Sequence, residues 1–176
     1  MTTNMEVKID YFSATFPLQC DEQDSVLFKV HEMVRCIATY LNVKNYEIVR
    51  TKYAQNNYNY QYFLGEYIIL RLDGPLNSYY QRTCHLEMKG NACGDFENRN
   101  KDKNWINFLL FMAQLNATFK RIDIAIDDLK GDVVSLKWLL DKIKKRHYIS
   151  VFKSKPKPIG TLEDGLTIQF GGNESE

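Results

Sequence analysis

Apolar residues recur along the chain at two spacings, one typical of strands and one typical of helices. Stretches rich in β-branched and aromatic residues predict strands. The predicted strands are residues 7–16, 46–53, 60–72, 82–89, 119–126, 148–153 and 166–170. Apolar positions three and four apart predict helices. The predicted helices are residues 25–41, residues 104–115 and a short one that begins at Ser135 and ends in a basic run.

The order of these elements predicts the fold class. Strands come in runs with helices between them, which is typical of an α+β protein with a mainly antiparallel sheet covered by helices on one face. A chain of 176 residues suits one domain with a sizeable core. The last predicted strand runs to Gly171-Gly172, and no capping element follows it. We therefore expect residues 1–176 to form a single domain that is truncated at its carboxyl end.

Composition narrows the class of protein further. Hydrophobic residues make up 44% of the chain and charged residues 26%, the balance of a globular protein. No basic segment followed by an apolar run opens the sequence, so we expect a cytoplasmic protein with reduced thiols and no membrane contact. The four cysteines form no CxxC pair, which makes a zinc site an unfavoured interpretation. Because the net charge is only +1, any contact with nucleic acid has to come from local charge.

One predicted strand carries alternating acidic and apolar residues. Residues two apart in a strand share a face, so Arg121, Asp123 and Asp127 should point one way. The opposite face carries an apolar row that we expect to pack on helices: Ile122, Ile124 and Ile126. An exposed polar face with a simple Arg–Asp pair explains the same pattern, and periodicity by itself favours that interpretation.

A second strand places His85, Glu87 and Lys89 on one face by the same alternation. If this strand lies beside the one that carries Asp123, an imidazole and several carboxylates converge. Oxygen-rich ligand sets suit Mg²⁺ or Mn²⁺ better than Zn²⁺, and such ions polarise the phosphate in phosphodiester cleavage. A structural hydrogen-bonding pair is the alternative for His85 and Glu87.

Two further segments have features of phosphate contacts. Gly90 and Gly94 flank a strand-to-helix connection whose amides could face a phosphate, although a plain turn before a helix fits equally. The run from Lys144 to Arg146 could engage a DNA backbone, and it could also simply complement a helix dipole.

Four segments in this order resemble the replication initiation factor (Rep_trans) family. These segments are HLEMKGNACGDFE, FKRIDIAIDD, SLKWLLDKIKKR and GLTIQFGG. The family covers rolling-circle initiators of plasmids and phages and the related relaxases of conjugative elements. The resemblance is close over roughly the second half of the chain and is limited to strand pattern in the first half.

The resemblance implies a relaxase-like nicking domain and a metal-dependent enzyme. In this family a tyrosine attacks a DNA phosphate and stays linked to the 5′ end. The implied ligands of Mg²⁺ or Mn²⁺ are Asp123, Asp127 and Glu87, with His85 and Cys93 as further candidate site residues. The implied DNA-binding residues are Lys89, Arg121, Lys144, Lys145 and Arg146. The implied partners are origin DNA, as duplex, hairpin or single strand, with a helicase and a second copy of the chain as further candidates.

Two departures from the family bear on activity. The family commonly has Arg at the position of Gly94, and the nucleophilic tyrosine is expected beyond residue 176. We therefore expect this chain to bind DNA without nicking it, as part of a longer endonuclease. The main alternative is a non-catalytic single-strand binding module that stacks bases on Tyr58, Tyr60 and Tyr62. A plain structural or regulatory domain is the third interpretation.

Overall fold

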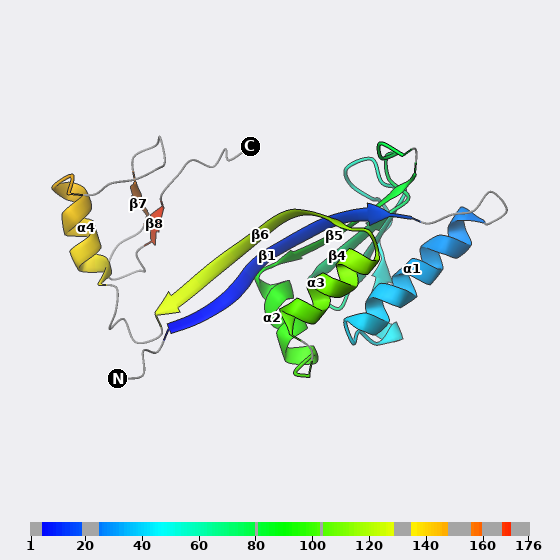
Figure 1. The fold of residues 1–176 in the computed structure, drawn as a ribbon, viewed down its shortest axis with the longest axis horizontal. Helices are drawn as coiled ribbons and strands as arrows, with labels where there is room; N and C mark the ends of the chain where they lie inside the picture. Colours follow the sequence, from blue (N-terminus) through cyan, green and yellow to red (C-terminus); the bar gives the residue numbers. More distant parts are fainter. Residues whose placement is uncertain are drawn as a thin grey trace. The chain divides into compact units, whose positions relative to one another are not determined.

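The computed structural model describes residues 5–18, 25–79, 81–102, 104–128, 135–147, 156–159 and 167–169. The chain divides into two compact units, one from Val7 to Ala125 and one that joins the first six residues to residues 126–176 (Figure 1). The strands are β1 (Met5–Pro17), β2 (Ile48–Arg50), β3 (Tyr60–Leu64), β4 (Ile68–Leu72), β5 (Thr83–Lys89), β6 (Thr118–Asp128), β7 (Lys157–Ile159) and β8 (Thr167–Gln169). The helices are α1 (Val26–Tyr40), α2 (Gly90–Arg99), α3 (Trp105–Gln114) and α4 (Leu136–Lys144), with a 3₁₀ turn at Asn45–Glu47.

A six-stranded sheet in the order β2-β3-β4-β5-β1-β6 organises the first unit. The pairs β2–β3, β3–β4, β4–β5 and β1–β5 are antiparallel, and Tyr11 lies opposite Lys89. Strand β6 runs against the direction of β1 at one edge (Figure 1). The α+β class with a mainly antiparallel sheet is thereby confirmed.

The core lies between this sheet and helices α1, α2 and α3, which cover one face (Figure 1). Alternation in the strands sends every second side chain into it: Phe12, Ala14 and Phe16 from β1, and Cys84, Leu86 and Met88 from β5. Aromatic rings join the layers, because Phe12 meets Phe108 edge-on with ring centroids 5.1 Å apart. None of these three helices lies on the other face of the sheet (Figure 1).

Two local predictions were wrong. The expected strand 60–72 is two strands, because Gly65 adopts a left-handed φ of 66° and opens a turn between β3 and β4. The segment expected to be a glycine turn is helix α2, which begins directly after β5 with Lys89 as its N-cap. Gly94 lies inside that helix. The predicted strand 148–153 lies outside the described residues.

The apolar row on β6 is exposed, so the expectation that it packs on helices was also wrong. Ile122 is 38% and Ile124 is 67% exposed, and Ile126 is exposed as well. The reason is position: β6 is an edge strand, and Figure 1 shows β1 and β6 running on past the ends of α2 and α3.

The second unit holds α4 and the antiparallel hairpin β7–β8. The hydroxyl of Ser135 accepts a hydrogen bond from the amide of Trp138 at 3.2 Å, which caps α4 where the sequence predicts its start. Strand β7 lies between the predicted strands 148–153 and 166–170, where the sequence predicts no strand. None of the helices in the described part of the chain has the length and hydropathy needed to cross a bilayer.

Candidate nucleic-acid interface

The face of the sheet opposite to α1, α2 and α3, here called the open face, is polar. Strand alternation sends His85, Glu87 and Lys89 to it from β5, as the sequence predicts. Tyr11 and Thr15 of β1 reach the same face, since each hydrogen-bonds to one of these β5 side chains. The open face therefore carries the candidate site residues of β5 together with Tyr11 and Thr15 of β1.

An ion pair between Arg71 and Glu87 forms the centre of this face. Arg71 Nη1 donates to Glu87 Oε2 at 2.8 Å, and Arg71 Nε donates to Gln61 Oε1 at 3.0 Å. Arg71 is only 3% exposed although it lies on the face opposite to α1, α2 and α3. Burial by itself raises the pKa of Glu87, but the hydrogen bonds from Arg71 and Tyr11 outweigh it and hold that pKa below its ordinary value. Glu87 is therefore a carboxylate with its charge already compensated.

Tyr11 contacts this pair directly. Its hydroxyl donates to Glu87 Oε1 at 3.0 Å, and the guanidinium of Arg121 lies 4.5 Å from its ring centroid. Burial and the neighbouring Glu87 raise the pKa of the Tyr11 hydroxyl. A nucleophilic phenol needs its pKa lowered, so the environment of Tyr11 does not activate it.

Arg121 and Asp123 pair with each other at the β6 edge. Arg121 Nε donates to Asp123 Oδ1 at 2.8 Å, and the hydrogen bonds from Arg121 hold the pKa of Asp123 below its ordinary value. Both side chains remain in contact with solvent. The arrangement fits the simple Arg–Asp pair that periodicity favours.

A hollow of about 420 Å³ opens beside this network. It is lined by Thr15, Asn56, Tyr58, Pro75, Leu76, Asn77, Thr83, His85 and Lys120. His85 Nδ1 lies 3.2 Å from the hydroxyl of Thr15, and burial together with the charge of Arg71 lowers the pKa of His85. The imidazole is thus neutral near pH 7, and Lys120 supplies the cation of this hollow.

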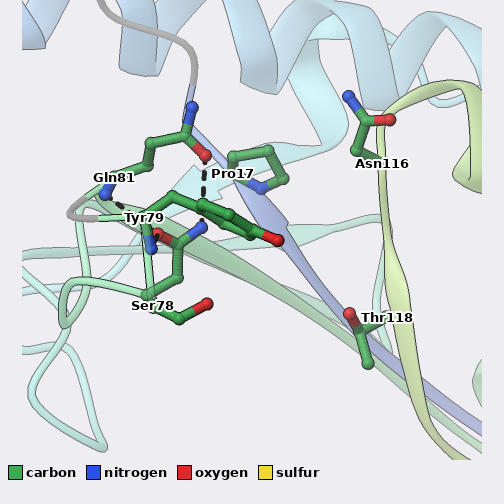
Figure 2. Close-up of a pocket in the computed structure, with 7 residues that line it drawn as sticks. Pro17, Ser78, Tyr79, Gln81, Asn116 and Thr118 are labelled. Atoms are coloured by element: carbon green, nitrogen blue, oxygen red, sulfur yellow. Dashed lines mark hydrogen bonds between the residues drawn. The ribbon is translucent and has the colours of Figure 1, made fainter.

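A second hollow of about 520 Å³ lies where β1 ends and β6 begins (Figure 2). It is lined by Pro17, Asn77, Ser78, Tyr79, Gln81, Asn116 and Thr118. Sequence reasoning missed this hollow and missed Arg71 and Lys120. One signal was available for Arg71, because a single arginine interrupts the apolar strand Ile68–Leu72.

The implied metal ligands lie on two strands, Glu87 on β5 and both Asp123 and Asp127 on β6. Strand β1 lies between β5 and β6, so Glu87 and Asp123 are two strands apart, and the condition under which these side chains would converge is not met. Each of the two carboxylates is engaged by an arginine. No group of three His, Cys, Asp or Glu residues able to hold a metal ion occurs among the described residues. Asp127 belongs to the second unit.

The remaining predicted site residues fall in three places. Cys93 is 1% exposed in the core, where burial raises the pKa of its thiol to about 12, so it lies away from the open face. Lys89 is exposed, with Nζ 3.5 Å from Glu87 Oε1. Lys144, Lys145 and Arg146 are exposed at the end of α4 in the second unit, and Lys145 pairs with Asp141 at 2.9 Å.

Comparison with solved structures identifies the class of fold. The structure of the rolling circle replication initiator protein from Geobacillus stearothermophilus matches with a TM-score of 0.70 at 24% sequence identity. The match covers 98% of this chain and 64% of that one. The sheet with helices on one face is therefore the fold of a rolling-circle initiator.

Sequence comparison gives the family. The model of the rolling circle replication initiation protein N-terminal domain matches residues 24–112, and the chain belongs to this family. It is also 32% identical over 158 residues to "Putative DNA relaxase NicK" of Bacillus subtilis (strain 168), a match that covers 86% of this chain and 44% of the relative. The chain thus spans less than half the length of that relative. The family match runs from α1 to α3 and includes Arg71 and Glu87.

Proposed function

We propose that this chain is the origin-binding part of a rolling-circle initiator or relaxase, and that its open face contacts DNA. The observation that carries the proposal is that three exposed cations lie next to members of the network around the compensated Arg71–Glu87 pair. Lys89 Nζ lies 3.5 Å from Glu87 Oε1, the guanidinium of Arg121 lies over the ring of Tyr11, and Lys120 lines the hollow that contains His85. Cations that are exposed and held by a rigid sheet can contact phosphates, whereas the buried pair below them keeps the surface fixed. Family membership supports the same role.

The activity of the longer protein is part of this proposal. We infer that it nicks origin DNA through a tyrosine outside residues 1–176, in replication of a plasmid or phage or in transfer of a conjugative element. It would act in the cytoplasm on duplex, hairpin or single-stranded origin DNA, with a helicase and a second copy of the chain as candidate partners. The basic cluster Lys144, Lys145 and Arg146 would add contacts to the DNA backbone.

We propose a divalent ion, Mg²⁺ or Mn²⁺, as a cofactor of the longer protein only. Asp123, Asp127 and Glu87 are the candidate ligands. In the described arrangement Glu87 and Asp123 hold arginines, so a ligand role requires them to exchange those partners for the ion. No step is assigned to the metal on this geometry.

The single-strand module with three stacking tyrosines is less well supported. Tyr62 is buried, and its ring belongs to the core cluster. The guanidinium of Arg50 lies 4.9 Å from the ring centroid of Tyr60, and Tyr58 is half-buried against His85. These three side chains do not form one exposed platform.

Salt-dependent DNA binding tests the proposed interface. Fluorescence anisotropy with origin DNA should give an affinity that falls linearly with salt on logarithmic axes, and Lys120→Ala or Arg121→Ala should each reduce that slope by about 0.7–0.9. The matched control is Lys101→Ala, which removes an exposed lysine from the turn between α2 and α3. Equal slopes for all variants, or no salt-sensitive binding, would refute the interface.

Nicking of a supercoiled plasmid that carries the origin tests the activity. We expect the longer protein, but not residues 1–176, to convert the plasmid to open circles with tyrosine-linked DNA when Mn²⁺ is present. Failure of both chains to nick, with binding retained, would mean that the fold serves binding only.

A further inference from the structure

We propose that the hollow around Tyr79 takes a single unpaired nucleobase of the DNA strand that the open face holds. This inference rests on the proposed function and specifies what part of the ligand enters the hollow. Its volume of about 520 Å³ lies within the range of roughly 300–1,000 Å³ found for small-molecule sites.

The lining of this hollow suits a base and not a phosphate. Of the described residues that line it, none is charged. They supply two kinds of group that recognise bases, an aromatic ring for stacking and amides and hydroxyls for base edges. The amides come from Asn77, Gln81 and Asn116, and the hydroxyls from Ser78, Tyr79 and Thr118.

Tyr79 is presented as a stacking surface. It is 80% exposed, so the ring is open to a ligand. Figure 2 shows its ring in the middle of the hollow, with the hydroxyl directed toward the side of Asn116 and Thr118. A base stacked on this ring would bury an aromatic face that the described part of the chain leaves in water.

The loop that carries Tyr79 is held in shape before any ligand arrives. Asn77 Oδ1 accepts hydrogen bonds from the backbone amides of both Tyr79 and Gln81 at 2.9 Å, and Asn77 Nδ2 donates to Gln81 Oε1 at 3.2 Å (Figure 2). The backbone amide of Asn77 also donates to the carbonyl of Gln81 at 2.8 Å. Such preorganisation reduces the entropy lost on binding. The hydrogen bond from Asn77 Nδ2 also engages the side-chain oxygen of Gln81, which leaves the Nε2 donors of Gln81 for other partners.

The neighbouring hollow beside His85 would take the next part of the bound DNA strand. Asn77 lines both hollows, and the hollow of about 420 Å³ beside His85 contains Lys120 and Thr15. A cation and a hydroxyl are groups that contact a phosphate. A nucleotide with its base at Tyr79 and its phosphate at Lys120 would therefore use both hollows. Paired bases cannot enter, because base pairing and stacking in a duplex occupy the same edges and faces.

The test compares single-stranded and duplex DNA with the complete 176-residue chain. The probe is a fluorescein-labelled strand of about 20 nucleotides and mixed sequence, longer than the roughly 4–16 nucleotides that single-strand sites occupy. The same strand annealed to its complement is the second probe. Tyr79→Ala should weaken single-strand binding about 5- to 160-fold, the effect of losing one stacked base, and should leave duplex binding unchanged. Tyr79→Phe should keep most of the affinity because it keeps the ring.

The matched control is Tyr46→Ala, since Tyr46 is 86% exposed and lies in the 3₁₀ turn away from the hollow. Its affinity should equal that of the unmodified chain. Unchanged single-strand affinity for Tyr79→Ala would overturn the base site, and so would a loss for Tyr79→Phe as large as that for Tyr79→Ala. Neither outcome bears on the proposed function, which the salt dependence of Lys120→Ala tests separately. An unmodified chain that binds neither probe would overturn both.

Discussion

Arg71 Nη1 lies 2.8 Å from Glu87 Oε2, and these two side chains connect four strands of the sheet. Arg71 belongs to β4 and also holds Gln61 of β3, whereas Glu87 belongs to β5 and accepts from Tyr11 of β1. The network therefore runs across the sheet, at right angles to the strands. Hydrogen bonds between neighbouring strands hold the strands in a fixed register, and they therefore fix the spacing of the cations next to the network.

Replacing Arg71 should destabilise the fold strongly. Arg71→Met leaves the carboxylate of Glu87 poorly compensated, so we expect a loss of about 3–5 kcal/mol in the free energy of unfolding. The double variant Arg71→Met with Glu87→Met should recover much of that loss. The control is Glu32→Gln, which breaks the exposed pair between Lys29 and Glu32 and should cost under about 1 kcal/mol. Denaturant titration measures all four proteins, and a loss below about 1 kcal/mol for Arg71→Met would contradict the role of the pair.

Stability should fall in acid through Glu87. The pKa of Glu87 in the folded protein lies below its ordinary value of 4.5, so the unfolded chain takes up the proton first as pH falls. Its contribution is complete above pH 4.5 and is lost as pH drops through the folded pKa. Glu87→Gln should therefore show a flatter decline of unfolding free energy in this acidic range. Identical pH profiles for the two proteins would show that Glu87 is not linked to stability.

His85 should titrate below its ordinary pKa of 6.5. Burial and the charge of Arg71 disfavour the imidazolium, so the unfolded chain binds this proton more readily and stability falls as pH drops below 6.5. An NMR titration of the His85 ring protons gives the midpoint directly. Because the charge of Arg71 contributes, Arg71→Met should move that midpoint upward, provided that the variant is folded at the temperature used. A midpoint at or above 6.5 in the unmodified protein would disprove the buried, neutral imidazole.

Two glycines should respond to alanine with opposite signs. A Cβ at Gly74 would lie 2.2 Å from Cε1 of Tyr58, so Gly74→Ala must displace that ring and should cost about 1–3 kcal/mol. A Cβ at Gly94 meets nothing within 4 Å, and Gly94 lies inside α2. Gly94→Ala should therefore stabilise the protein by roughly 0.5–1 kcal/mol. Equilibrium unfolding of both variants checks the signs.

The elements were predictable where the signal was local. The apolar face of α1 and the strand that stops at Pro17 follow from spacing and from one residue that restricts the backbone. The turn at Gly65 was missed because a single glycine in an otherwise apolar run has too little turn chemistry around it. The predicted face of the sheet was correct for each β5 residue, since alternation depends only on the strand itself.

The site was predictable only in part, because it depends on strand order. Sequence pattern placed Glu87 and Lys89 on one face, but it could not show that β1 separates that strand from β6. The hollow at Tyr79 combines the end of β1, a loop and the start of β6, three segments far apart along the chain. Periodicity describes each segment and contains no information on which ends meet.

The order β5-β1-β6 also has a consequence for how the chain folds. Strand β1 is paired on both sides by strands synthesised much later, and residue 11 meets its β5 partner at residue 89. Such pairings give a high contact order, and closing long loops before native contacts form slows folding, toward milliseconds to seconds. During translation β1 must wait unpaired until β5 has left the ribosome. This interval is when its exposed edges are most open to aggregation or to chaperones.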